Sequence, residues 1–348
     1  MLYMLKLKKI SMRLQRLGKN GRWKLMNSKK LNQIKTYTPY DVGYFNTTDG
    51  QEIYFEQSGH PMGVPVLYLH GGPGAGLGND YRELFSSFSN IRLIGIDQRG
   101  AGKSKPLGTL KNNTIHHLIA DIEYLREYLH VSSWYIFGGS WGSTLALAYS
   151  VQFPQHIRGL NLWGIFYCQK KEIEWLFHTT APLMYPDIFS DLNHGINHSS
   201  LKELLEIYYI YLHQENTERE FATRWLLWEA FTAEHPHPIY DEFDDWNATN
   251  EAIACAKIEH HYFSNTPLRI NQEDDLESAV KKANFQFPIY ITHGRNDLVT
   301  PAASAISLKN NTLNSKMNIL DNCGHSLIHV GMRNSIHHFA KELLEKYN

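Results

Sequence analysis

Residues 137–149 read FGGSWGSTLALAY and surround one serine with three glycines, directly before a run of small and apolar residues. The preceding residues 134–138 (WYIFG) are typical of a buried strand, and the residues that follow predict a helix. A glycine-rich turn at such a junction either cradles a phosphate or presents a nucleophile. Neither GxxxxGK[ST] nor GxGxxG is present. The G-x-S-x-G pattern over 138–142 therefore favours a nucleophile elbow, with Ser140 at its tip, over a simple glycine turn.

Short apolar runs alternate with helical periods on both sides of this turn. Residues 43–59 predict a hairpin that turns at Asp49-Gly50, and apolar residues at helical spacing predict a helix after Thr114, its N-cap. This alternation predicts an α/β fold with a mostly parallel central sheet. The apolar runs at residues 64–70 and 91–97 are typical of parallel strands buried on both faces, and residues 157–166 and 287–294 predict further strands of the sheet.

The pattern changes between residues 168 and 280, where aromatic-rich helical stretches replace the alternation and no convincing strand occurs. A helical insertion in an α/β sheet predicts a cap domain, which is where specificity usually resides. We therefore expect an α/β core over 37–167 and 281–348 and an inserted helical cap domain over 168–280.

The first 36 residues differ in charge from the rest of the chain. Residues 1–30 hold ten Lys or Arg and no acid, which leaves 24 basic and 35 acidic residues in the remainder, a net charge of −11. We expect residues 1–36 to form a poorly ordered basic extension, with a transit-type or membrane-surface peptide as the alternative. The acidic remainder argues against a nucleic-acid partner.

Cysteine usage and hydropathy indicate the compartment. Cys168, Cys255 and Cys323 are odd in number and far apart in the sequence, so they predict no disulfide framework and favour a reducing, cytoplasmic location. No apolar run approaches the roughly 20 residues that span a bilayer, so we expect no stable membrane insertion.

A serine nucleophile needs a base, and the base needs an acid that orients it. After an elbow of this type the partners follow in the order Ser, Asp, His. Asp297 comes just after the strand at 287–294, and His325 lies in a loop after the apolar run 315–320. Because the chain has 19 histidines, an isolated one is more often structural, but His325 follows Gly324 at the expected station. We predict the triad Ser140, Asp297 and His325.

Two backbone amides must stabilise the oxyanion of the tetrahedral intermediate. One is expected from Trp141, the residue after the nucleophile, and the other from the glycine-rich loop 70–74 (HGGPG). Gly72 is the best candidate in that loop, since glycine lets the backbone approach a substrate closely. We therefore expect acyl transfer through a serine acyl-enzyme, with no metal and no cofactor.

Several longer segments carry a resemblance to a known family. In order along the chain they are LHGGPGAG (69–76), IDQRGAGKS (96–104), FGGSWGSTLALAY (137–149), GIF (164–166), WE (228–229), IEHHYF (258–263), GRNDLVTP (294–301) and GHS (324–326). The chain resembles the proline iminopeptidases, serine peptidases of the α/β-hydrolase fold, from about Tyr37 to its end. The resemblance implies an α/β-hydrolase fold and release of N-terminal proline from short peptides.

The same resemblance implies roles for three residues in substrate binding. Glu229 and Glu259 match two cap glutamates that bind the free amino terminus, and Phe166 matches the aromatic residue of the proline pocket. Two carboxylates beside aromatic residues suit a partly buried ammonium, although a helical glutamate is more often solvated. Phe166 is equally compatible with a core role.

Departures from the family pattern leave alternatives open. Many relatives carry arginines just after GIF and an aromatic pair after the next tryptophan, where this chain has Lys170-Lys171 and Leu176-Phe177. The leucine leaves open a broader small-residue aminopeptidase. A second alternative is an esterase or lactonase on the same fold, which would not need the Glu229/Glu259 pair. A third is a hydrolase-like protein that only binds its ligand, which would not need an intact triad.

Overall fold

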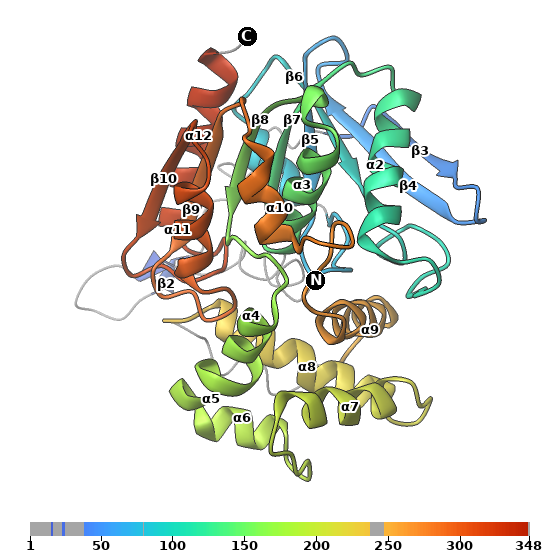
Figure 1. Cartoon of the computed structure of the whole chain (residues 1–348), viewed down its shortest axis with the longest axis vertical. Helices are drawn as coiled ribbons and strands as arrows, with labels where there is room; N and C mark the ends of the chain where they lie inside the picture. The colour runs from blue at the N-terminus through green and yellow to red at the C-terminus, as the bar shows by residue number, and fades with distance from the viewer. Residues whose placement is uncertain (1–14, 17–22, 25–37, 79, 237–246, 347–348) are drawn as a thin grey trace.

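The computed structural model describes residues 15–16, 23–24, 38–78, 80–236 and 247–346 (Figure 1). Its centre is an eight-stranded sheet in the order β10-β9-β8-β7-β5-β6-β4-β3. The strands β5 to β10 run parallel, and β4 and β3 join them antiparallel at one edge. The predicted α/β class with a mostly parallel sheet is confirmed. The strands are β3 (Asp41–Asn46), β4 (Glu52–Gly59), β5 (Val64–Leu69), β6 (Ile91–Ile96), β7 (Trp134–Gly139), β8 (Ile157–Trp163), β9 (Ile289–Gly294) and β10 (Ser315–Leu320).

Helices cover both faces of the sheet, which is why its inner strands consist almost wholly of apolar residues. One face packs against α2 (Ile115–Tyr128), α3 (Trp141–Gln152), α10 (Leu276–Ala283) and α11 (Ala302–Asn310). The other face packs against the 3-10 helix η2 (Asp80–Phe85) and the C-terminal helix α12 (Val330–Lys346).

The sheet register brings the predicted catalytic segments together. The strand β7, which leads into the elbow, pairs with β5 on one side and with β8 on the other. Leu69 at the end of β5 lies opposite Gly138 of β7, so the loop that begins at His70 emerges beside Ser140. In parallel sheets ligands bind beyond the carboxyl ends of the strands, and the site is expected at this edge.

The described elements between β8 and α10 are all helical and gather at that same end of the sheet (Figure 1). They comprise α4 (Lys170–Glu174), the π-helix η4 (Trp175–Thr179), α5 (Ala181–Met184), α6 (Pro186–Leu192), α7 (Leu201–Leu212), α8 (Glu218–Ala233) and α9 (Asn250–Ser264). A helical cap over the carboxyl edge is consistent with this arrangement, and the exact domain limits at residues 168 and 280 stay a prediction.

Two further expectations concern the start of α2 and the N-terminal extension. Thr114 precedes α2 as expected, but its hydroxyl contacts His117 Nδ1 at 2.8 Å and makes no capping bond to the helix backbone. Of the basic extension 1–36, the structure describes only two short antiparallel strands, β1 (Gln15–Arg16) and β2 (Trp23–Lys24). The expected disorder of the extension lies outside the described residues.

The turn between β7 and α3 has the geometry of a nucleophile elbow. Ser140 has φ 56° and ψ −127°, in the positive-φ region that residues other than glycine rarely adopt. The glycines around it are required by space as well. A Cβ on Gly138 would lie 2.5 Å from the carbonyl oxygen of Gly142, and one on Gly142 would collide with the carbonyl oxygen of Leu69. Strand, helix and elbow can approach this closely only without those side chains.

We predict that Gly142→Ala destabilises the protein strongly, because its Cβ meets fixed backbone that cannot move aside. The expected loss is about 3 kcal/mol or more, which lowers Tm by at least about 6 °C. Gly50→Ala is the control, since it introduces a side chain at positive φ into open space and costs about 1 kcal/mol. Thermal unfolding of the two variants should separate them clearly, and equal Tm values would contradict the steric account.

Candidate active site

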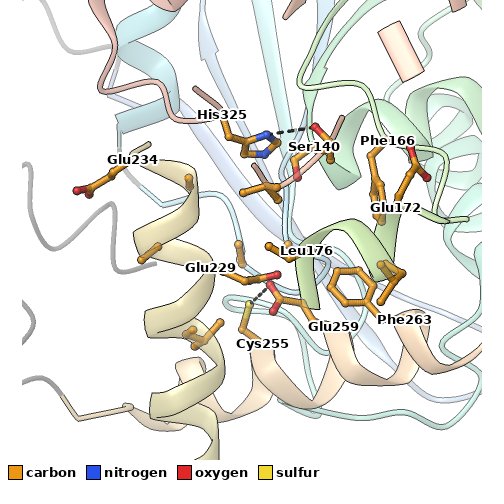
Figure 2. A pocket seen from close by; sticks show the side chains of 18 residues that line it. Ser140, Phe166, Glu172, Leu176, Glu229, Glu234, Cys255, Glu259, Phe263 and His325 are labelled. Atoms are coloured by element: carbon orange, nitrogen blue, oxygen red, sulfur yellow. Dashed lines mark hydrogen bonds between the residues drawn. The ribbon is translucent and has the colours of Figure 1, made fainter. Parts of the chain in front are cut away.

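The three predicted triad residues converge at the carboxyl edge of the sheet. Asp297 follows β9 and is buried, and its Oδ2 lies 2.7 Å from Nδ1 of His325. His325 lies in the loop between β10 and α12. Figure 2 shows the Ser140 side chain pointing toward the ring of His325. Because Nδ1 is engaged by the carboxylate, the opposite ring nitrogen is the one available to a serine hydroxyl.

A tight turn holds the Asp297 carboxylate. Its Oδ1 accepts the amides of Val299 at 2.9 Å and Thr300 at 2.8 Å, and its Oδ2 accepts the Thr300 hydroxyl at 3.1 Å. Burial alone would raise the pKa of Asp297, but the charge and hydrogen bond of His325 outweigh it, and the pKa is lowered. The carboxylate therefore stays ionised beside the imidazole.

The loop after β5 lies against the elbow, as an oxyanion hole requires. A Cβ on Gly71 would lie 3.4 Å from the carbonyl oxygen of Gly139 and 3.5 Å from Cβ of Ser140. Gly72 has φ 108° and lines the cavity that contains Ser140. Trp141 is the first residue of α3, so its amide has no acceptor within the helix. Trp141 thus adjoins the nucleophile and Gly72 lines the same cavity, and the oxyanion-hole role of their amides stays a prediction.

A buried hydrogen-bond network fixes these two loops to each other. The indole of Trp141 donates to Oε1 of Gln98 at 2.8 Å, and Nε2 of Gln98 donates to the carbonyl of His70 at 2.9 Å. The amide of Gln98 donates in turn to Nε2 of His70 at 3.0 Å. Burial lowers the pKa of His70 to about 4, so this ring is a neutral acceptor at physiological pH.

A cavity of about 230 Å³ lies between Ser140 and the helices α8 and α9. Ser140, His325 and Gly72 form part of its wall, and Glu229 and Glu259 form another part. Figure 2 shows the two glutamate carboxyl groups pointing toward one another between α8 and α9. The rest of the lining is mainly apolar and includes Phe166, Ile173, Leu176, Leu226, Phe263 and Val299.

The two glutamates differ in how the protein holds them. Glu259 is 2% exposed, and its carboxylate accepts the indole of Trp225 at 2.8 Å and the thiol of Cys255 at 3.3 Å. Glu229 is half-buried and hydrogen-bonds to Glu259. The pair places acceptor oxygens in a mainly apolar cavity, which suits a cationic ligand group.

Burial and mutual repulsion both act on this pair. Burial, followed by the charge of Glu259, raises the pKa of Glu229 well above its ordinary value. Burial also raises the pKa of Glu259, against the hydrogen bonds from Glu229, Trp225 and Cys255. Two like charges in contact favour retention of a proton, so burial and repulsion together oppose full ionisation of the pair in the free protein.

Phe166 lies in the cavity wall and is fixed to the nucleophile's helix. Its amide donates to the hydroxyl of Ser143 at 3.2 Å, and its carbonyl accepts the hydroxyl of Thr144 at 2.7 Å. Its ring packs edge-on against Phe263. Leu176 also lines the cavity, whereas its neighbour Phe177 packs against Trp225 in the interior. Phe166, Phe263 and Leu176 are therefore part of an apolar wall that also includes Ile173, Leu226 and Val299.

Sequence reasoning missed two groups that line the site. Cys255 was noted only as an unpaired cysteine, yet its thiol donates to Glu259, and burial raises its pKa so that it stays protonated. Glu172 is fully buried in the cavity wall and accepts the amide of Gln169 at 2.9 Å and the hydroxyl of Ser304 at 2.6 Å. Burial raises the pKa of Glu172 to about 7. Cys255 lies on α9 and Glu172 on α4, and no short sequence motif marks either residue as part of a site.

The described part of the chain contains neither a cluster of metal ligands nor a membrane-spanning helix. No group of three or more His, Cys, Asp or Glu side chains there is arranged to hold a metal ion. None of the described helices is both long and apolar enough to cross a bilayer.

The sequence of this chain is similar to known proteins of one family. The sequence matches the family described as alpha/beta hydrolase fold over residues 64–331. It is 37% identical over 302 residues to a probable proline iminopeptidase from Leptolyngbya boryana, covering 86% of this chain and 92% of the relative. The proline iminopeptidase of Arabidopsis thaliana is 37% identical over 297 residues, with 84% and 77% coverage. The chain belongs to the proline iminopeptidase family.

Solved structures confirm the fold of this family member. The proline iminopeptidase of Mycobacterium smegmatis superposes with a TM-score of 0.57 at 14% identity, covering 88% of this chain and 98% of that one. VinJ superposes with a TM-score of 0.62 at 20% identity, covering 89% and 100%. The predicted α/β-hydrolase fold is therefore confirmed.

The paired glutamates predict a distinctive dependence of stability on pH. Their raised pKa values mean that the folded state binds more protons than the unfolded state above the ordinary glutamate pKa, so stability falls as pH rises through the raised values. Glu229→Gln removes one titrating group and should flatten this fall. We expect its Tm to exceed that of the wild type at pH 8 by about 2 °C or more, with a smaller difference at pH 5.

The matched control for that measurement is Glu251→Gln, which removes an exposed carboxylate from the same helix, α9, that carries Glu259. It should give no such gain at pH 8. A Tm difference for Glu229→Gln that is constant between pH 5 and pH 8 would show that the pair is not strained by its charge.

Proposed function

We propose that this protein is a proline iminopeptidase that removes an N-terminal proline from short peptides through an acyl-enzyme on Ser140. One observation carries the proposal: Ser140 and His325, which is paired with Asp297, line the same small cavity as the buried Glu259 and the half-buried Glu229. The triad explains the chemistry, and the glutamates explain why the substrate must present a free amino terminus. The names of the relatives support the same activity.

In the proposed reaction His325 takes the proton of the Ser140 hydroxyl, and the serine oxygen attacks the carbonyl carbon of the N-terminal residue. The oxyanion that forms accepts hydrogen bonds from the amides of Gly72 and Trp141. Asp297 stabilises the imidazolium, which then protonates the departing amine. Water, deprotonated by His325, attacks the acyl-enzyme and releases the free amino acid.

The proposed substrate position follows from the two ends of the cavity. The N-terminal ammonium would lie at Glu229 and Glu259, and the proline ring would lie against Phe166 and the neighbouring apolar groups. Only a residue whose amino group is free can place its carbonyl at Ser140 while its charge meets the glutamates. The arrangement therefore supports an exopeptidase over an esterase, for which two carboxyl groups in the pocket would be a cost.

The cysteines also bear on the cellular location. The three cysteines are free and buried in the structure, and unpaired thiols are typical of reducing compartments. We infer a cytoplasmic location on that basis.

Substrate comparison tests the proposal directly. We expect hydrolysis of a prolyl-arylamide with a free amine, slower hydrolysis of the alanyl-arylamide, and none of the N-blocked prolyl-arylamide, because only a free amine can meet the glutamates. Ser140→Ala should lower kcat/KM by at least about 10⁴-fold. Cleavage of the blocked substrate at the rate of the free one would refute the aminopeptidase activity, while persistent turnover by Ser140→Ala would refute the nucleophile.

The ammonium-binding role of the glutamates makes a separate prediction. Glu229→Gln and Glu259→Gln should each lower kcat/KM for the prolyl-arylamide by about 10- to 100-fold, the size of a lost charged hydrogen bond. Hydrolysis of p-nitrophenyl acetate should stay near the wild-type rate, because that ester carries no amine. Glu251→Gln serves again as the control, and equal losses on both substrates would rule out this role.

A further inference from the structure

A second histidine, His293, lies on the far side of the triad acid. It belongs to β9, is fully buried, and precedes the segment GRNDLVTP in the sequence. Its Nε2 lies 3.4 Å from Oδ2 of Asp297, the oxygen that also contacts His325. His293 therefore contacts the reacting triad without facing the substrate cavity.

The hydrogen bonds of His293 fix its tautomer. Its Nδ1 accepts the backbone amide of Ile165 at 3.1 Å, so that nitrogen carries no proton. Its Nε2 therefore carries the proton and donates to the carbonyl of Thr300 at 3.1 Å, with Asp297 Oδ2 close by. Burial lowers the pKa of His293; the charged groups that face it are Asp297, which opposes this, and His325, which adds to it. The ring is thus a neutral bridge with one acceptor and one donor.

Each end of this bridge leads to a different part of the site. The donor end meets the turn of Thr300, whose amide and hydroxyl hold the Asp297 carboxylate. The acceptor end holds Ile165, which lies between Gly164 and Phe166. A Cβ on Gly164 would lie 2.7 Å from Cε1 of His325, so this loop also packs against the base.

We propose that His293 is a positioning residue that couples the proline-pocket loop at Ile165–Phe166 to the triad acid Asp297. This inference rests on the proposed function for the role of the pocket. Through Nε2–H it holds the carbonyl of Thr300, whose turn holds the carboxylate, and its N–H dipole, close to Oδ2, draws part of the carboxylate's charge away from His325. Through Nδ1 it sets the position of the loop that carries Phe166. One ring thereby sets both the acid's orientation and the pocket's width.

Two amide substitutions separate the two ends of the ring. His293→Asn places an amide oxygen where Nδ1 lies, so it keeps the Ile165 contact and loses the donor to Thr300 and Asp297. His293→Gln places an amide nitrogen where Nε2 lies, so it keeps that donor and loses the Ile165 contact. Thr292→Val is the matched control, because Thr292 is a buried neighbour in β9 whose hydroxyl contacts Ser335 and not the triad.

The two variants should fail in different ways. For His293→Asn we expect kcat to fall about tenfold on both p-nitrophenyl acetate and prolyl-arylamide. The acidic limb of its kcat/KM profile should move to higher pH, since a carboxylate without the neighbouring N–H dipole attracts the imidazolium more strongly. For His293→Gln we expect an unshifted limb, near-normal ester hydrolysis, and about a tenfold loss of the preference for prolyl- over alanyl-arylamide, mainly through KM.

Three results would contradict the positioning role of His293 or the proposed function. If the two variants lose activity in the same proportion on all substrates and the acidic limb does not move, His293 only packs the core and the proposal fails. It fails as well if both match Thr292→Val, with changes in Tm alone. Hydrolysis of p-nitrophenyl acetate does not depend on the proline pocket. If the wild type hydrolyses this ester but no prolyl-arylamide, the proposed function is refuted. The ester assay of His293→Asn then still tests the link between His293 and Asp297.

A measurement on the wild type covers the case in which the variants do not fold. Nitrogen-15 NMR of histidine-labelled protein should show His293 as a neutral Nε2–H tautomer from pH 5 to pH 8. Its Nε2 signal should shift in Asp297→Asn, while the signal of His260, a buried histidine on α9, should not. An Nδ1–H tautomer, or a His293 signal indifferent to Asp297, would overturn the proposal.

Discussion

The positive φ of Ser140 is the constraint on which the rest of the site depends. A serine in that conformation is strained, and it is kept there because the surrounding structure admits no other path from β7 into α3. Its amide donates to the carbonyl of Trp163 at 3.0 Å, and the glycines on both sides allow strand and helix to close around it. This backbone conformation places the hydroxyl at the carboxyl edge of the sheet, where the loops after β5, β8, β9 and β10 begin.

The substrate side of the site stores a different kind of strain. Two carboxyl groups share an apolar cavity, and the protein supplies only the indole of Trp225 and the thiol of Cys255 to Glu259. In the free protein, burial and mutual repulsion therefore oppose the ionisation of both carboxyl groups. A ligand ammonium would relieve that repulsion, so binding selectivity and reduced stability of the free protein have the same origin.

The sequence predicted the features whose chemistry lies in short local motifs. The elbow and the buried strands depend on residues near one another in the chain, and Ser140, Asp297 and His325 each stand in a short motif of their own; the structure brings the three side chains together. The contacts of Cys255 and His293 could not be predicted in this way, because they depend on how distant segments meet. Thr114 shows the same limit on a small scale, since its neighbour His117 takes the hydroxyl that a cap would use.

The cavity also has a fixed length, which follows from how its walls are joined to the triad. Phe166 is tied to α3 through Ser143 and Thr144, so the apolar wall keeps its distance from Ser140. The end of α8 is tied to the histidine loop, because the amide of Ser326 donates to the carbonyl of Ala233 at 3.0 Å. Glu229 lies one turn earlier on that helix. The ammonium site therefore stands at a set distance from the nucleophile, and under the proposed function that distance limits cleavage to the first peptide bond.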